Sequence, residues 1–292
     1  LLVVFTLLSD TVRGIQVMGM TIQTFYFIGF LVIFYISKFL ATRINHQEEL
    51  TTRDNVKLFV ILLLFCVLIA KVNMSTAIIL FITGLVIFYV GNVKMKYILM
   101  VVALAAIVVA FALNTNFGRM ETFRNRWTYY ITNDNTNGYG DQMILSKAAI
   151  ARSGLHPTGP GNGVIKYRLP ERETDYVYAS LCEESGLIVG LLVIFLYLVL
   201  FYRARIISRE SDGAFGTLLA FGIGFWFTCQ AFVHIGVDCE LLPATGQTLP
   251  FISSGGASLF ISGCAVGILL NISKVNAQEK LREDPRQYFH GN

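Results

Sequence analysis

The chain has 292 residues, of which 54% are apolar and only 14% are charged, and its mean hydropathy is +0.60. This composition is too apolar for an ordinary soluble domain of the same length, and the net charge of +4 gives no indication of a nucleic-acid partner. We therefore predict an all-α polytopic membrane protein, because a chain inside a bilayer must pair its backbone polar groups within helices.

Several stretches are apolar over the roughly 20 residues that a helix needs to cross a bilayer. They lie at approximately 22–42, 56–72, 74–92, 96–114, 176–201, 214–235 and 251–273, and residues 1–8 resemble the end of a further span. The chain opens without Met inside this apolar run, which is not typical of a signal peptide, so we expect a longer natural protein. All of these spans are expected to form one membrane domain over residues 1–292.

The distribution of Lys and Arg predicts the orientation of the spans. Basic residues gather in the connections 43–57, 93–96 and 202–213 and in the tail 274–292. The turns at 71–73 and 237–250 contain only one, Lys71. Since basic residues near span ends stay in the cytoplasm, we expect the C-terminal tail inside and the long segment 115–175 outside.

The segment 115–175 is far longer than an ordinary connection between packed helices, and loops of this length are commonly functional. Residues 133–142 are rich in Asn and Gly, which favours turns. The apolar residues of 143–155 recur at helical spacing. We therefore expect a short amphipathic helix along the outer surface, ending at "HPTGPGNG" (156–163).

A group of charged residues ends this loop, in "RLPERETD" (168–175). Thr174 is positioned to cap the next helix, which would place Asp175 in its first turn. Asp175 is then either a simple interfacial cap or a base that accepts a proton from a substrate hydroxyl. In the second case, neighbouring cations would hold an anionic group such as a diphosphate. The charged neighbours are Lys166, Arg168, Glu171, Arg172 and Glu173.

Two more acids, Glu183 and Glu184, follow within the predicted span, where a carboxylate is costly unless it faces a partner or a polar cavity. On one continuous helix, at about 100° per residue, Glu183 lies about 80° from Asp175 and Glu184 about 180° from it. Glu183 is thus the better candidate to share a cavity with Asp175. Either acid can instead be neutral, or paired within the bundle.

A second unusual segment is "LLPATGQTLPFISSGGAS" (241–258), whose prolines and glycines are incompatible with a straight helix. Irregular backbone at membrane depth is stable only when it is buried in protein or lines a wet cavity. Its polar side chains suit a polar headgroup, and a re-entrant turn without a ligand is the alternative. The candidate contacts are Thr245, Gln247, Ser253 and Ser254.

The Cys and His residues follow no metal-binding spacing, and no group of carboxylates resembles a metal cage. We therefore predict no dedicated metal site and no certain cofactor. A divalent cation such as Mg²⁺ or Mn²⁺ bridging a bound diphosphate stays open.

Four motifs, in this order and spacing, resemble the SEDS family (shape, elongation, division and sporulation), which includes FtsW, RodA and SpoVE. They are "YGDQMILSKAAIARSGL", "GPGNG", "LPERETDYVYASLCEESGLIVG" and "LLPATGQTLPFISSGGAS". The resemblance extends from Arg13 to Ser273. It implies a SEDS-type helical bundle, which has ten spans in the family, with a large extracytoplasmic loop between the seventh and the eighth. This chain would hold about seven of those spans and part of another.

The resemblance also implies a function: a glycosyltransferase of the bacterial cytoplasmic membrane that polymerises lipid II at its outer face. A class B penicillin-binding protein and other divisome or elongasome membrane proteins would be its partners. Asp175, in "TDY", matches the essential acid of the family and would act as general base. Lys147 matches a Lys of the loop helix, and Glu183 and Glu184 match a pair of acids after the essential one.

Several positions depart from the family pattern. Tyr26 and Glu240 stand where the family has Glu and Gly, and His234 stands where it has Asn. Ser254 replaces a Tyr, and "VNMST" (72–76) replaces "QPDLGT". These departures bear on substrate details and on the branch of the family. "GPGNG" and "TGQTLP" favour the division-type branch, whereas "LPERETD" resembles the RodA branch.

Two other functions stay open. A transporter that moves a lipid-linked precursor across the membrane would also need ionisable residues in its helices. The candidate acids collect on the outer side, however, whereas such a transporter should bind headgroups from both sides. The third possibility is a scaffold that recruits division partners, against which the intact surroundings of Asp175 argue.

Overall fold

A computed structural model describes residues 15–17, 20–22, 24–113, 120–133, 140–154, 157–165, 168–169 and 171–283 of the chain. Within these ranges the protein is a helical bundle, which confirms the predicted fold class. One small antiparallel hairpin accompanies the helices, with Gln16 of β1 (Ile15–Val17) paired to Thr21 of β2 (Met20–Ile22).

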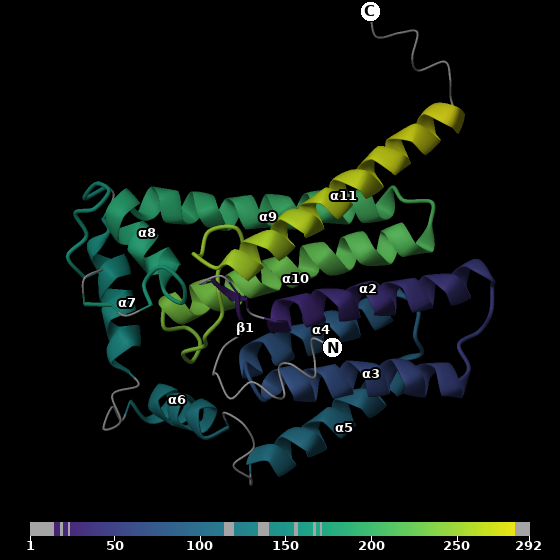
Figure 1. The fold of residues 1–292 in the computed structure, drawn as a ribbon, viewed down its shortest axis with the longest axis horizontal. Coiled ribbons are helices and arrows are strands. Elements are labelled where there is room, and N and C mark those ends of the chain that lie inside the picture. The colour runs from purple at the N-terminus through teal and green to yellow at the C-terminus, as the bar shows by residue number, and fades with distance from the viewer. Residues whose placement is uncertain are drawn as a thin grey trace, which may run out of the picture.

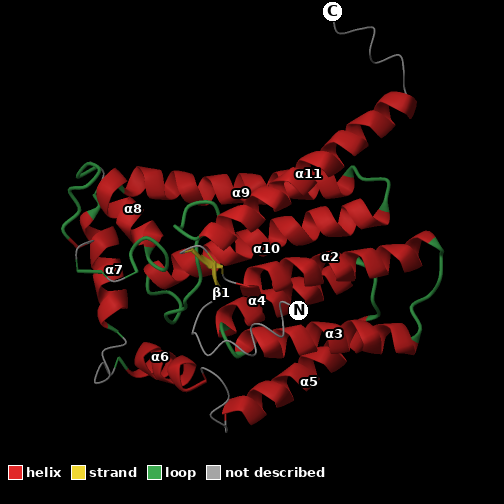
Figure 2. Cartoon of the chain, viewed as in Figure 1, coloured by secondary structure: helices red, strands yellow, loops and turns green. Residues whose placement is uncertain are grey.

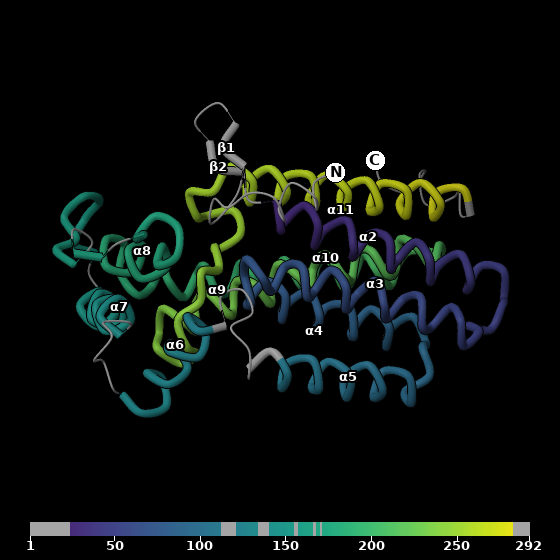
Figure 3. Tube along the Cα trace, turned by 60° about the horizontal axis from the view of Figure 1, so that its bottom comes forward, coloured from purple at the N-terminus to yellow at the C-terminus, as the bar shows by residue number. Residues whose placement is uncertain are grey.

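The long helices run side by side and form the bundle (Figure 1). They are α2 (Thr24–Asn45), α3 (Thr52–Ala70), α4 (Met74–Val90), α5 (Met95–Leu113), α9 (Leu187–Arg209), α10 (Ala214–Asp238) and α11 (Gly256–Glu283). Three shorter helices, α6 (Met120–Thr132), α7 (Asp141–Arg152) and α8 (Val177–Ser185), gather with the longest loops at one end of it (Figure 2). A view turned by 60° keeps them at that end (Figure 3).

In the described part of the chain, four helical segments are both long and apolar enough to cross a membrane: α2, α9, α10 and Gly256–Arg282 of α11. The apolar helix α4 and residues Met95–Phe111 of α5 are shorter. In α3, the charged residues Arg53, Asp54 and Lys57 occupy the first two turns and shorten the apolar part. The chain is therefore a polytopic membrane protein whose helices differ in how completely they are apolar.

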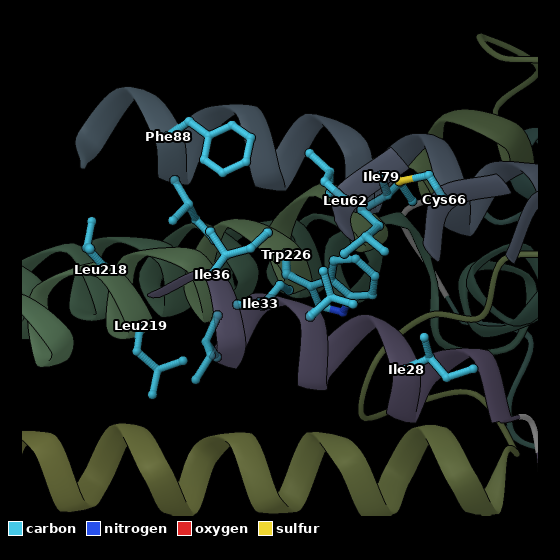
Figure 4. Close-up of a cluster of buried hydrophobic side chains, with 14 of the residues drawn as sticks. Ile28, Ile33, Ile36, Leu62, Cys66, Ile79, Phe88, Leu218, Leu219 and Trp226 are labelled. Carbon is cyan, nitrogen blue, oxygen red and sulfur yellow. The ribbon is translucent and has the colours of Figure 1, made fainter. Parts of the chain in front are cut away.

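The bundle is held by a core between α2, α3, α4 and α10 (Figure 4). Trp226 of α10 is 1% exposed and lies against α2, where Gly29 leaves room for its ring. A Cβ atom at Gly29 would stand 2.8 Å from the indole. Close packing of this kind positions α10, and with it the segment that follows α10 at the loop end of the molecule.

The single span predicted over 176–201 is wrong. The chain forms two helices, α8 and α9, which are separated at Gly186 with φ +85° and ψ 163°. Only glycine adopts this conformation without strain, and a hydropathy pattern does not reveal such a break. The last span likewise begins at Gly256 rather than at 251, because the residues before it form turns.

The amphipathic helix expected over 143–155 is present as α7, which begins two residues earlier and ends at Arg152. The helix α6 was not predicted, because its charges and hydroxyls obscure the apolar spacing of "METFRNRWTYYIT". Three of its aromatic rings, those of Phe123, Trp127 and Tyr130, lie along one side of the helix. Phe123 and Trp127 stack with ring centroids 6.0 Å apart, and Tyr129 is buried.

We predict that Gly190→Ala destabilises the fold, because the packing of α9 on α8 leaves no room for a methyl group. A Cβ atom there would lie 2.6 Å from Sγ of Cys182 and 3.0 Å from the hydroxyl of Tyr178. Overpacking of this kind lowers the free energy of unfolding by about 1–3 kcal/mol. Thermal unfolding of the purified protein measures the effect.

The matched control is Gly263→Ala in α11, where a Cβ atom has no neighbour within 4 Å. Both substitutions gain the same helix propensity, so the difference between them isolates the clash. Equal melting temperatures for the two variants would contradict the packing of α8 on α9 described above.

Candidate active site

Asp175 lies in a turn before α8 and not within the helix. Tyr176 is the N-cap, and its side chain makes no capping hydrogen bond. Thr174, the predicted cap, donates its hydroxyl to the carbonyl oxygen of Glu171 (3.2 Å) and to the carboxylate of Glu171 (2.8 Å). The N–H of Asp175 also donates to that carbonyl, at 2.9 Å. The prediction that Asp175 occupies the first helical turn is thus wrong, and a turn closed on Glu171 presents it.

The irregular segment 241–255 holds this turn in place. The hydroxyl of Ser253 donates to the carbonyl oxygen of Thr174 and accepts from the N–H of Leu249, both at 2.8 Å. The N–H of Ser254 donates to the carbonyl oxygen of Glu173, also at 2.8 Å. Ser253 therefore holds the backbone at Thr174, the residue that directly precedes Asp175.

Asp175 opens into a narrow cleft of about 70 Å³. Asn73 before α4, Arg126 of α6 and Gly246 of the irregular segment also line it. Gly246 lies close to the acid, since a Cβ atom there would be 3.6 Å from Oδ2 of Asp175. Asn73 fixes this wall, because its amide donates to the carbonyl oxygen of Gly246 at 3.0 Å. The cleft thus sets one carboxylate beside one guanidinium and a close-lying backbone.

Burial and the charges around this turn shift the pKa of Tyr176. Its burial raises the pKa of the phenol, the positive charge of Arg126 lowers it, and the negative charges of Asp238 and Asp175 raise it further. Both Arg126 and Asp175 therefore act electrostatically on the same small region. Neither Arg126 nor Asn73 was predicted as a site residue. The arginine could have been found only if α6 had been recognised as a helix.

Lys147 lies on α7 and forms an ion pair with Glu240, with Nζ 2.7 Å from Oε2. The hydroxyl of Tyr129 in α6 donates to the other oxygen of Glu240 at 3.3 Å. Glu240 has φ +59°, a conformation that glycine tolerates best. Lys147 is not among the described residues that line the cleft of Asp175. The pair instead joins two loop helices to the end of α10.

Glu183 is buried and accepts hydrogen bonds from the N–H groups of Val164 and Ile165, each at 2.9 Å. Its carboxylate anchors the loop before the charged turn and is not among the described groups lining the cleft. The predicted shared cavity with Asp175 assumed a continuous helix through both residues. Because α8 begins only at Val177, that angular argument does not apply.

Other predicted contacts lie on the far side of the turn. Arg172, Glu184 and Ser254 line a second pocket of about 440 Å³ together with Glu173. Nη2 of Arg172 is 3.5 Å from the carboxylate of Glu173. Arg168 is exposed. Lys166 lies outside the described residues.

Gln247 is fully buried and belongs to a hydrogen-bonded network rather than to a surface of the cleft. Its side chain accepts from Thr76 of α4 at 2.9 Å and donates to the hydroxyl of Tyr26 in α2 at 3.4 Å. The Tyr26 hydroxyl is also 2.6 Å from that of Thr248. Thr245 has a buried hydroxyl without a partner in the described part of the chain.

No group of three or more His, Cys, Asp or Glu side chains that could hold a metal ion occurs among the residues that the structure describes. Arg126 lines the same cleft as Asp175 and offers a positive charge there to an anionic group.

A model of the FtsW/RodA/SpoVE family, described as cell cycle proteins, matches residues 1–278. The chain belongs to this family. A relative from Coxiella burnetii, "Probable peptidoglycan glycosyltransferase FtsW", is 30% identical over 285 residues, which cover 94% of this chain and 75% of that protein. The protein of the same name from Escherichia coli O6:H1 is 33% identical over 76% of this chain. The match spans only 54% of the length of the latter.

Solved structures agree on the fold. One of them is a chain from "Structural coordination of polymerization and crosslinking by a peptidoglycan synthase complex", with a TM-score of 0.70 and 19% identity over 95% of this chain and 80% of that one. The Thermus thermophilus rod shape determining protein RodA matches with a TM-score of 0.60 and 18% identity, over 94% of this chain and 76% of RodA. The family members with FtsW names agree with the predicted division-type branch.

We predict that Glu240→Gln lowers the pKa of Lys147 toward its ordinary value of 10.5, because the hydrogen bond and charge of Glu240 raise it. A Lys with a raised pKa contributes its stabilisation at neutral pH and loses it as the pH rises through that pKa. NMR titration of ¹³C-methylated lysines measures the shift.

Lys94 provides the control, since its pKa is raised by another partner, Glu49, at 3.0 Å. Its titration should not change in the Glu240→Gln variant. An unchanged titration of Lys147 would show that the pair does not form in solution.

Proposed function

We propose that this chain is a peptidoglycan glycosyltransferase that polymerises lipid II into glycan strands at the outer face of the bacterial cytoplasmic membrane. The observation that carries the proposal is the position of Asp175, a carboxylate presented by a rigid turn into a cleft that also contains Arg126. Membership of the FtsW/RodA/SpoVE family and the names of the relatives support the same activity.

In this reaction, the 4-hydroxyl of one disaccharide attacks the anomeric carbon of another, and the diphosphate leaves with inversion of that centre. The new C–O bond forms as the bond from carbon to diphosphate oxygen breaks. Asp175 would take the proton of the attacking hydroxyl as general base. Arg126, which lines the same cleft, has the charge that a departing diphosphate requires.

The remaining predicted contacts belong to the same proposal. Arg172, Glu184 and Ser254 border a pocket large enough for sugars on the other side of the turn. Lys166 and Arg168 would add positive charge near the diphosphates. Lys147 would act through its ion pair with Glu240, which holds α7 to the end of α10. Glu183, Thr245, Gln247 and Ser253 would act through the backbone segments that they hold, rather than by touching the substrate.

We further propose that residues 115–175 lie outside the membrane and that the C-terminal tail is cytoplasmic, as the positions of the basic residues favour. A class B penicillin-binding protein would cross-link the product, with other division or elongation proteins nearby. In support, a solved chain that matches this one with a TM-score of 0.70 comes from a study of the coordination of polymerization and crosslinking by a peptidoglycan synthase complex.

We predict that Asp175→Asn abolishes polymerisation, because the amide is isosteric with the acid and cannot take a proton. Loss of a general base lowers the rate by about 10²–10⁴-fold. Binding of lipid II and the melting temperature should stay close to the wild-type values. Fluorescent lipid II, incubated with the full-length protein and its penicillin-binding partner, is resolved on a gel by glycan length.

A variant that retains about a tenth of the wild-type rate would remove Asp175 from the role of base. A wild-type protein that binds lipid II but makes no glycan, even with its partner, would favour transport of the precursor or scaffolding instead.

We predict that Arg126→Gln lowers kcat/KM at least about tenfold, because a cation next to the reacting diphosphate is lost. Arg124→Gln is the matched control, since Arg124 is exposed on the same helix and is not among the cleft-lining residues. The same glycan assay measures both. Equal activity of the two variants would show that the charge in the cleft is unimportant.

A further inference from the structure

Two ionisable side chains that the proposed reaction does not use are buried together at the end of α10. His234 and Asp238 lie one helical turn apart, both side chains are 0% exposed, and Nε2 of the imidazole is 3.5 Å from Oδ2 of the carboxylate. A carboxylate removed from water is costly unless it is paired and hydrogen-bonded. Its contacts therefore indicate why this acid is present.

Asp238 contacts two of the short helices. Its Oδ2 accepts a hydrogen bond from the N–H of Ala179 at 2.9 Å, and its carbonyl oxygen accepts one from the hydroxyl of Ser146 in α7 at 3.0 Å. Ala179 is the third residue of α8. Its N–H is one of the amides that have no acceptor within their own helix. Asp238 therefore caps α8, a role that neither Thr174 nor Asp175 has.

His234 connects this pair to the irregular segment. Its Nδ1 is 2.7 Å from the carbonyl oxygen of Gln247, the residue that follows Gly246 of the cleft wall. A carbonyl oxygen only accepts, so Nδ1 carries a proton. The other nitrogen, Nε2, then faces an oxygen that already accepts from Ala179.

Nε2 makes no hydrogen bond among the described groups and faces Oδ2 at 3.5 Å. The positive end of α8, which Oδ2 contacts through the N–H of Ala179, favours a negative charge at this position. Oδ1 of Asp238 has no hydrogen-bond partner among the described groups, so Oδ2 carries the contact with α8.

We propose that Asp238, held by His234, is a positioning residue of the active site. It caps α8 from α10 and leaves the carboxylate of Asp175 to the cleft. His234 holds Gln247, and through it the wall at Gly246, at the same depth. Helix α10 thus positions both α8, which follows Asp175, and the cleft wall at Gly246. This inference rests on the proposed glycosyltransferase function for its kinetic consequence, but not for the cap itself.

The test compares Asp238→Leu with Asp238→Asn in the full-length protein and its partner. Leucine removes the acceptor for Ala179. Asparagine keeps it, because its amide oxygen can take the place of Oδ2. We expect the Leu variant to lose about 100-fold in kcat, since a displaced general base is costly, with KM for lipid II within about twofold. The Asn variant should stay within about threefold of wild type.

Hydrogen exchange of the amides in residues 171–179 provides a readout independent of activity. The Leu variant should lose protection at Ala179, and the Asn variant should keep it. Gln230→Leu is the matched control, because Gln230 is also buried and lies two turns earlier on the same face of α10. It should change neither kcat nor the exchange of these amides.

Wild-type kcat in the Leu variant, or equal losses in the Leu and Asn variants, would overturn the proposal. If the Leu variant does not fold, His234→Leu replaces it, and the same loss of kcat at constant KM is expected. A wild-type protein without polymerase activity would refute the glycosyltransferase function. Protection of Ala179 in the Asn variant but not in the Leu variant would still establish the cap.

Discussion

The structure depends on one constraint: the irregular backbone between α10 and α11 has to satisfy its polar groups inside the protein. Each polar group that is buried without a partner would be costly. Asn73 donates to the carbonyl oxygen of Gly246, His234 contacts that of Gln247, and the hydroxyl of Tyr26 accepts from the N–H of Thr248. Thr76 holds the same segment through the side chain of Gln247. Its own serines in turn hold the turn that carries Asp175. The position of the catalytic candidate therefore follows from hydrogen bonding of the backbone.

The same segment explains why three departures from the family pattern are compatible with the fold. Tyr26 binds Thr248, His234 binds Gln247, and Glu240 binds Lys147 and Tyr129. Each of these side chains is directed at residues 238–248 or at the helices beside them. These three departures thus affect the hydrogen bonds that hold the segment in place. They do not change the residues immediately around Asp175.

The irregular segment contributes residues to two pockets that lie around the charged turn. The narrow cleft lies between Asp175 and α6, and the wider pocket lies between Arg172 and α8. The charged residues of "RLPERETD" are divided between these spaces and the surface. Sequence proximity alone suggested one common group, but a turn only a few residues long presents neighbouring side chains in different directions.

The sequence by itself determined the membrane class, the positions of most long helices, the amphipathic helix α7 and the charged motif that offers Asp175 as a candidate base. These features follow from hydropathy, helical spacing and local motifs, which act over a few turns of chain. Tertiary structure alone decided the break at Gly186, the contribution of Arg126 from α6, and the replacement of Thr174 by Asp238 as the cap of α8. Asp238 and Ala179 are 59 residues apart, and no local pattern reveals a hydrogen bond that forms only when α10 packs against α8.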